Sequence, residues 1–295
     1  MNYYDEGIHP MVFSRQRTFR QPVQVFGVGL HSGIECSVSL KPAAVSTGIL
    51  VQIDGGMLMP IDRVHVIKTL RCTRLSDIEG NSVDTPEHLL AALALAGVDN
   101  CIIEFNSAEV PILDGCASAW LQHFAQAGIV DYTAPAQMFE VTESFSFNEG
   151  GSSYIVTPGH ARIIVDIEFD HPMIGRQIVD VTGGQFLSLA SSRTFVLEKD
   201  VSRLQAAGLA LGGSLDSAIV IGDTDVLNPG GFRFDDECAR HKALDLIGDM
   251  YVLGHRIIGA IHASRPSHSA NASFVAALKA SGVLRMDVPV MSEAA

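Results

Sequence analysis

The sequence predicts an α+β fold made of two similar sheet-and-helix domains. Short runs of β-branched and aromatic residues stand close together, and apolar stretches of helical length are interspersed among them. This arrangement is typical of α+β layers and not of a strictly alternating parallel sheet. A similar succession of strands and helices occurs in each half of the chain. Each half can therefore stack a sheet on helices, with the helices of the two halves facing each other.

In the first half, three short strands precede a helix, and a strand and a second helix follow. We expect them at Val23–Phe26, Cys36–Leu40, Leu50–Ile53, Pro86–Ala96, Cys101–Phe105 and Ala117–Ala127. In the second half, two strands precede a helix, and a strand, a long helix, a strand and a last helix follow. We expect them at Ile155–Val156, Ile163–Phe169, Val201–Ala207, Ser217–Ile221, Asp235–Leu253, Ile257–Ala263 and Ala272–Ala280. The loop-like composition of residues 130–137 places the domain boundary near residue 132, which gives domains 1–132 and 133–295.

The composition excludes several classes of protein. Of the 295 residues, 47% are hydrophobic and 18% are charged, which excludes intrinsic disorder. The formal net charge of −13 is the reverse of what a nucleic-acid-binding protein usually carries. Five cysteines with no repeated spacing favour a reducing compartment, and the acidic N-terminus has no apolar signal region. The longest apolar run, Leu89–Val98, is too short to span a bilayer. We expect a cytoplasmic globular protein.

The first cluster of chemically capable residues stands at the start of a helix. Thr85 is a good N-cap, Pro86 suits the first helical position, and Glu87 and His88 then lie in the first turn. Because the positive end of the helix dipole disfavours a protonated imidazole, His88 is expected to be neutral and free to bind a metal. The alternative is that Glu87 only complements the dipole and that His88 is an ordinary half-buried histidine.

The second cluster lies on the long helix of the second half. His241 and Asp245 are four residues apart and share one helix face, and Asp249 extends that stripe by another turn. The neighbouring residues are apolar, and buried carboxylates need a partner or a metal. An imidazole and a carboxylate at this spacing suit zinc. The alternative is an ordinary His–Asp pair on a solvated face.

Further candidates are weaker when taken alone. His268 follows an apolar strand and precedes a helix, a position where catalytic groups often stand, although a lone loop histidine is more often surface decoration. The glycine-rich segments 27–33 and 211–214 are interpreted as turns, since the first lacks the lysine of a phosphate-binding loop. Asp235 is the expected cap of the long helix.

Together these residues predict metal-assisted amide hydrolysis. His88, His241 and Asp245 would make a three-ligand zinc site with one position open for water. Glu87 could take the proton from that water, and His268 could protonate a leaving group or stabilise an oxyanion. Lys242, next to a ligand, could supply positive charge.

The chain resembles the UDP-3-O-acyl-N-acetylglucosamine deacetylase family, the zinc amidases of lipid A biosynthesis. The resemblance rests on motifs that follow the family's order over about residues 15–278. They are Gly27–Gly33, Thr85–Leu89, Glu109–Gly115, Asp170–Gln177, Ser192–Phe195, Leu211–Ser214, Arg240–Asp249, and the segment with Gly259 and His268.

The resemblance implies two similar α+β domains with active-site helices sandwiched between the sheets and an inserted element in each half. It implies zinc held by His88, His241 and Asp245, and Glu87 as general base. His268 would be the general acid or oxyanion stabiliser, oriented by Asp249. Thr194 would help to hold the tetrahedral intermediate, and Lys242 and Phe195 would contact substrate.

The second insert, expected within Ile163–Thr182, would form an apolar passage for the fatty acyl chain. The substrate would be a UDP-linked acylated amino sugar whose 2-acetamido group is hydrolysed to the free amine and acetate, the committed step of lipid A biosynthesis. Besides Lys242, Arg193 and Arg240 are candidates for binding its diphosphate. We expect a monomer, and weak association with the inner membrane stays open.

Three features depart from the family pattern: Pro86 replaces a β-branched residue, Cys116 stands where serine is common, and residues 1–14 match nothing. Two other hypotheses stand beside the family's reaction. The protein could be a metal-dependent amidohydrolase acting on another small amide, or a non-catalytic protein with a structural metal. A structural zinc site is normally closed by four protein ligands, often cysteines, and no cysteine pair is available here.

Overall fold

Two five-stranded sheets with the same strand order form the framework of the molecule. The computed structural model describes residues 13–69 and 71–287. The N-terminal sheet has the order β2 (Val23–Val28), β3 (Glu35–Pro42), β9 (Cys101–Phe105), β4 (Ile49–Ile53) and β5 (Met59–Pro60). The C-terminal sheet has the order β12 (Phe145–Glu149), β13 (Ser152–Thr157), β19 (Ala260–Ser264), β14 (Arg162–Glu168) and β15 (Arg176–Thr182). In both sheets only the third and fourth strands run parallel.

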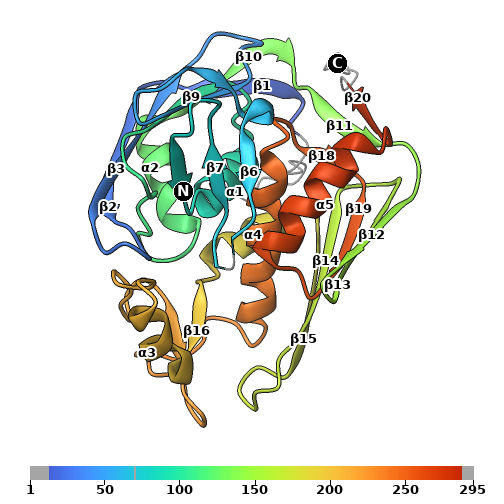
Figure 1. Ribbon diagram of the computed structural model, residues 1–295. Helices are drawn as coiled ribbons and strands as arrows, with labels where there is room; N and C mark the ends of the chain where they lie inside the picture. Colours follow the sequence, from blue (N-terminus) through green and yellow to red (C-terminus); the bar gives the residue numbers. More distant parts are fainter. Residues whose placement is uncertain (1–12, 70, 288–295) are drawn as a thin grey trace.

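Helices fill the space between these two sheets (Figure 1). They are α1 (Glu87–Ala96), α2 (Ser118–Ala127), α4 (Glu237–Tyr251) and α5 (His268–Ala280). All ten residues of α1 are buried, and the apolar sequence from Leu89 onward predicts this for eight of them. α1 packs against α4, and α4 in turn packs against β14 and β15. The α+β class is confirmed, and the core lies around the two helices that carry the candidate site.

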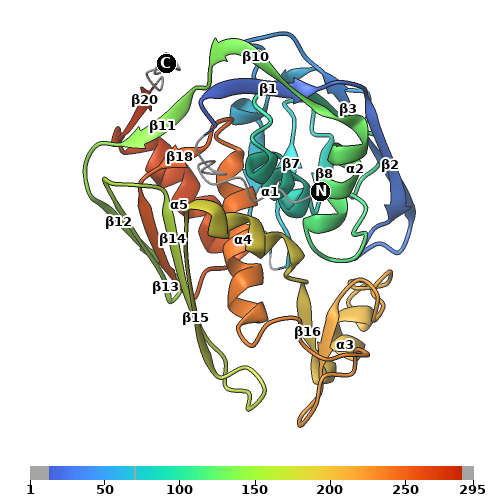
Figure 2. The same ribbon diagram turned by 180° about the vertical axis from the view of Figure 1, so that it is seen from behind.

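Smaller elements surround this framework. Short sheets are formed by β1 (Arg15–Phe19) with β10 (Ile129–Pro135), by β6 (His65–Ile67), β7 (Arg74–Ser76) and β8 (Ser82–Asp84), and by β18 (Ile257–Ile258), β11 (Met138–Val141) and β20 (Leu284–Asp287). The 3-10 helices are η1 (Ile61–Arg63) and η2 (Gly183–Ser191). A parallel pair, β16 (Phe195–Leu197) and β17 (Ile219–Ile221), joins with α3 (Glu198–Ala206) in a unit that projects from the body (Figures 1 and 2).

The expected strands and helices are present, with differences at their ends. The expected strand Ile257–Ala263 is divided into β18 and β19 at Gly259, where φ is 156° and an added Cβ would lie 2.6 Å from Val141. The last helix begins at His268 rather than near Ala272, because Ser267 caps it by accepting a hydrogen bond from the Ala270 N–H. His268 is therefore a helical residue and not a loop residue.

The expected side-chain caps of α1 and α4 were wrong. Thr85 adopts a left-handed φ of 61°, and its hydroxyl donates to Glu109 Oε1 at 3.2 Å instead of capping the helix. Pro86 is the N-cap residue, and Glu87 is the first helical residue. At the start of α4 the N-cap residue is Asp236, and its carboxylate pairs with Arg240 at 2.6 Å. The expected cap Asp235 lies one residue before this N-cap position, and neither helix has a side-chain cap.

The expected boundary near residue 132 lies inside β10. This strand pairs with β1, and the Tyr132 hydroxyl donates to the Ala43 carbonyl at 2.7 Å. The division into domains 1–132 and 133–295 stays a prediction. No helix in residues 13–69 and 71–287 combines the length and the apolar character needed to cross a membrane.

Candidate metal centre and its pocket

The start of α1 lies directly against the middle of α4. A Cβ added at Gly248 would lie 2.0 Å from the carbonyl oxygen of Glu87, so only glycine allows the two helices to approach this closely at that point. Asp245 and Asp249 stand on either side of Gly248 along α4. The contact therefore brings Glu87 and His88 beside the acidic stripe of α4.

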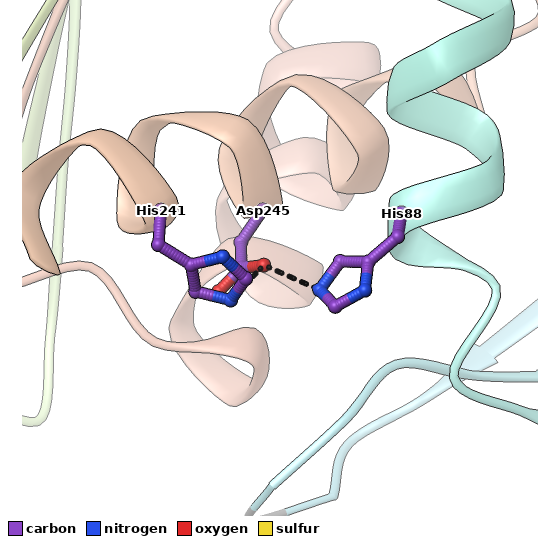
Figure 3. Close-up of side chains that lie close together, drawn as sticks. All are labelled: His88, His241 and Asp245. Carbon is purple, nitrogen blue, oxygen red and sulfur yellow. Dashed lines mark ion pairs between the residues drawn. The ribbon is translucent and has the colours of Figure 1, made fainter. Parts of the chain in front are cut away.

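His88, His241 and Asp245 converge in this contact (Figure 3). Each residue offers a ligand atom, and these atoms lie within 4.8 Å of one another. The Nε2 atoms of His88 and His241 lie 3.4 and 3.2 Å from Asp245 Oδ1. The two rings meet edge to face, with centroids 5.0 Å apart. All three residues are buried, so the side chains expected to be ligands share one point in the interior.

The chemistry of this group fits a divalent metal. Asp245 Oδ1 is buried and accepts no hydrogen bond within the described residues. A buried carboxylate oxygen without a partner is costly unless a cation is bound there. His241 Nδ1 lies 3.1 Å from the Ser192 carbonyl oxygen, and donation from Nδ1–H leaves the lone pair of Nε2 free. Two imidazole nitrogens and one carboxylate oxygen are a ligand set that zinc accepts.

The protonation states also suit metal binding. Burial, aided by His88 and Lys242, lowers the pKa of His241 to about 3, so its imidazole is neutral at physiological pH. Burial alone would raise the pKa of Asp245, but the facing His241 and Lys242 hold it well below its usual range. The Lys242 ammonium lies 2.8 Å from Asp245 Oδ2, and this carboxylate raises the pKa of Lys242 against the opposing effect of burial.

Glu87 lies beside the three candidate ligands and is buried. Burial raises its pKa to about 7. Its Oε2 accepts a hydrogen bond from the Thr73 backbone N–H at 3.2 Å, which fixes the carboxylate, and its Oε1 lies 3.8 Å from His268 Nε2. A carboxylate with a pKa near 7 can accept and release a proton at neutral pH.

His268 is held by Asp249 and points toward the candidate metal position. Its Nδ1 lies 3.1 Å from Asp249 Oδ2, and its Nε2 lies 3.5 Å from Asp245 Oδ2. Although burial alone would lower the pKa of His268, the carboxylates of Asp249, Asp245 and Glu87 raise it to about 9. The imidazole is therefore protonated at neutral pH and can donate a proton from Nε2.

Two residues that the sequence analysis missed orient Asp249. The Thr73 hydroxyl donates to Asp249 Oδ1, and the Asn271 amide donates to Oδ2 at 2.7 Å. The Tyr154 hydroxyl donates to the Asn271 carbonyl oxygen at 2.6 Å. Asn271 could have been found from its spacing, since it stands one helical turn after His268. Thr73 carries no such signal, because its segment has no helical period.

A cavity of about 450 Å³ opens beside this cluster. Glu87, His88, His241 and His268 contribute to one wall, together with Lys242, Thr194 and Phe195. The Phe195 ring lies 6.3 Å from the His241 ring and 5.8 Å from the Lys242 ammonium. The cavity wall also contains His31 and Arg71, which the sequence analysis did not select. Neither residue belongs to a helix or strand whose pattern would have pointed to it.

The expected place of the apolar passage was wrong. Residues 163–182 lie largely in β14 and β15 of the C-terminal sheet, and Phe169 is the residue of this range that lines the cavity. The apolar lining comes mainly from the projecting unit, with Val196, Val201, Leu204, Ala218 and Val220. The alternation of apolar residues in 163–182 reflects the buried face of a hairpin, whose apolar side chains pack on the core.

Two arginines considered for the diphosphate are already paired. The Arg193 guanidinium is buried and bonds Glu237 at 2.9 and 3.0 Å, and it does not line the cavity. Arg240 bonds Asp236 at 2.6 Å and Ser188 at 3.0 Å. Lys242, which is paired with Asp245, and Arg71 are cationic side chains that line the cavity.

Comparisons with known proteins point to one family. The model of the UDP-3-O-acyl N-acetylglycosamine deacetylase family matches residues 16–280. The UDP-3-O-acyl-N-acetylglucosamine deacetylase of Pasteurella multocida is 39% identical over 275 residues, covering 90% of each chain. The proteins of the same name from Actinobacillus succinogenes and Haemophilus influenzae are 39% identical over 273 and 275 residues, again covering 90% of each chain.

Proposed function

The chain belongs to the UDP-3-O-acyl-N-acetylglucosamine deacetylase family, and from this premise we propose how its residues carry out the reaction. The protein is a hydrolase that removes the acetyl group from a UDP-linked, 3-O-acylated N-acetylglucosamine, in the deacetylation step of lipid A biosynthesis. The products are the free amine and acetate. The observation that carries the proposed mechanism is the convergence of His88, His241 and Asp245 beside a cavity that Glu87 and the two histidines line.

The metal of this reaction is zinc, and His88, His241 and Asp245 hold it. The unpartnered Asp245 Oδ1 and the neutral His241 support this assignment. When bound, zinc supplies a Lewis acid that polarises a carbonyl and lowers the pKa of water from 15.7 to about 7. Lys242 holds the second oxygen of Asp245, which keeps that carboxylate turned toward the imidazoles.

Glu87 is the general base. Its carboxylate removes a proton from the attacking water, and the Thr73 N–H keeps it in place. General-base catalysis of this kind contributes about 10²–10⁴-fold to the rate.

His268 protonates the leaving amine or stabilises the oxyanion. Its Nδ1 is bonded to Asp249, so the Nε2–H faces the reacting group. Lys242 places a further positive charge at the same wall, and Thr194 lies there to hold the tetrahedral intermediate.

The cavity accommodates the remainder of the substrate. The apolar side chains of the projecting unit take the fatty acyl chain, and Phe195, whose ring lies 6.3 Å from the His241 ring, contacts the substrate. Lys242 and Arg71 supply positive charge toward the diphosphate in a protein whose net charge is −13. We also place the protein in the reducing cytoplasm, because its five cysteines are free, and we expect a monomer.

The direct test is acetate release from the acylated UDP-sugar by zinc-loaded protein. We expect acetate and free amine in equal amounts. Zinc-loaded protein that hydrolyses another small amide but releases no acetate from this substrate would contradict the proposed function. Analytical ultracentrifugation of the same sample tests whether the protein is a monomer.

A further inference from the structure

Glu237 and Arg193 form a buried ion pair next to the candidate metal centre. Glu237 begins α4 and its side chain has no exposed surface. Its Oε1 accepts hydrogen bonds from the Arg193 N–H at 3.1 Å and from Arg193 Nε at 2.9 Å. Its Oε2 accepts from Arg193 Nη2 at 3.0 Å and from the Arg233 N–H at 2.6 Å. One carboxylate therefore binds both the guanidinium and the backbone of Arg193.

Both sequence neighbours of Arg193 belong to the site. The Ser192 carbonyl oxygen lies 3.1 Å from His241 Nδ1, and Thr194 lines the cavity. Glu237 and His241 are one helical turn apart on α4. The ion pair thus ties segment 192–194 to the same helix that presents His241.

This tie controls which nitrogen of His241 is free. A fixed Ser192 carbonyl oxygen accepts from Nδ1–H and keeps Nε2 unprotonated, and Nε2 lies 3.2 Å from Asp245 Oδ1. A partner of this kind sets both the tautomer and the orientation of a ligating imidazole. A buried ion pair often contributes little to the net free energy of unfolding. The presence of this pair therefore does not by itself indicate a stabilising role.

We propose that the Glu237–Arg193 pair positions the metal ligand His241 and the catalytic residue Thr194. Neither member of the pair lines the cavity, so both are positioning residues and not catalytic ones. The proposal rests on the proposed function in one respect, that His241 is a metal ligand. Loss of the pair should weaken zinc binding by about 10–100-fold, the usual effect of removing a partner that orients a ligand.

The test uses the double variant Arg193→Met/Glu237→Gln in the full-length protein. It removes both charges together, so no unpaired charge is buried, and the glutamine oxygen can still accept from one of the two backbone N–H groups that Glu237 binds. The matched control is Asp236→Asn, which breaks the ion pair with Arg240 on the same helix and leaves segment 192–194 untouched.

Zinc affinity is measured by competition with a chelator, without substrate, and the cobalt-substituted proteins are compared by their visible absorption spectra. We expect about 10–100-fold weaker zinc binding and a changed cobalt spectrum in the double variant. The metal-free double variant should keep the circular dichroism of the parent, and the control should bind zinc as the parent does. At saturating zinc, kcat should fall more than KM changes.

Unchanged zinc affinity with an unchanged cobalt spectrum would overturn the proposal. If the double variant does not fold, Arg193→Lys is measured instead, because lysine keeps the charge but cannot reproduce the two-pronged contact. We then expect a smaller loss of zinc affinity, and an unchanged affinity would again overturn the proposal. A parent protein that binds zinc but releases no acetate would refute the proposed function and leave this inference intact.

Discussion

At the scale of single residues, the site brings together two ionisable side chains, Glu87 and His268, that have different pKa values. Burial gives Glu87 a pKa of about 7, whereas three carboxylates give His268 a pKa of about 9. Near neutral pH the first can be a base while the second is an acid. Glu87 Oε1 and His268 Nε2 lie 3.8 Å apart, so both groups can reach the same reacting group.

The Glu87→Gln variant should retain zinc and lose about 10²–10⁴-fold in kcat. The amide keeps the shape of the side chain but cannot accept the proton of water. Rates of acetate release and zinc content of the same preparation check this prediction. Full activity in this variant would remove Glu87 from its role as base.

The pH profile of kcat/KM should be bell-shaped. Activity requires ionised Glu87 and protonated His268, so it rises as Glu87 loses its proton and falls as His268 loses its own. The two limbs lie near pH 7 and pH 9 for the metal-free pKa values, and a bound cation moves both to lower pH because it disfavours the protonated forms. The His268→Ala variant should lose the falling limb, and its persistence would reassign that limb to another group.

Asp245→Ala should weaken zinc binding, whereas Asp249→Asn should not. Both residues lie on the same face of α4, but Asp245 is among the three converging candidate ligands and Asp249 bonds His268. The asparagine variant should therefore keep zinc and lose activity. Chelator competition on both proteins separates the two roles, and equal zinc affinity in the two variants would mean that the ligand assignment is wrong.

At the scale of elements, the approach of α1 to α4 depends on one glycine. In the Gly248→Ala variant the new Cβ cannot fit against the Glu87 carbonyl, so α1 must shift. We expect a loss of about 1–3 kcal/mol in the free energy of unfolding, as overpacking usually costs, together with weaker zinc binding. Thermal unfolding and chelator competition test both effects. Gly184→Ala is the control, because nothing lies within 4 Å of an added Cβ there.

The sequence revealed the elements and the convergent residues more readily than their surroundings. The spacing of His241 and Asp245 on a helix and the apolar sequence of α1 are local patterns, and both predictions match the structure. The expected cap Thr85 was wrong because its hydroxyl donates to Glu109, a partner that tertiary packing sets, and the expected cap Asp235 was wrong because α4 has Asp236 as its N-cap residue. The family resemblance placed the passage within residues 163–182, but these residues lie largely in a hairpin of the C-terminal sheet, and Phe169 is the one of them that lines the cavity.

At the scale of the whole molecule, zinc should stabilise the entire fold. α1 and α4 stand far apart in the sequence, and the candidate ligands bridge them. A ligand that binds only the folded state adds about 4.1 kcal/mol to the free energy of unfolding at a thousandfold excess over Kd. Thermal unfolding of metal-free and zinc-loaded protein measures this shift. The Asp245→Ala variant should show little zinc-dependent shift in thermal unfolding. An equal shift in that variant would contradict the assignment of Asp245 as a ligand that joins α1 and α4.

The division of the ligands between α1 and α4 also sets an order of events during synthesis on the ribosome. The segment with Glu87 and His88 leaves the ribosome before α4 is synthesised, so the residues that it contacts in the folded protein are still missing. His241 and Asp245 follow more than 150 residues later, and His268 follows them. A polypeptide that ends before these residues therefore lacks part of the candidate site, and we expect it not to cleave acetamides.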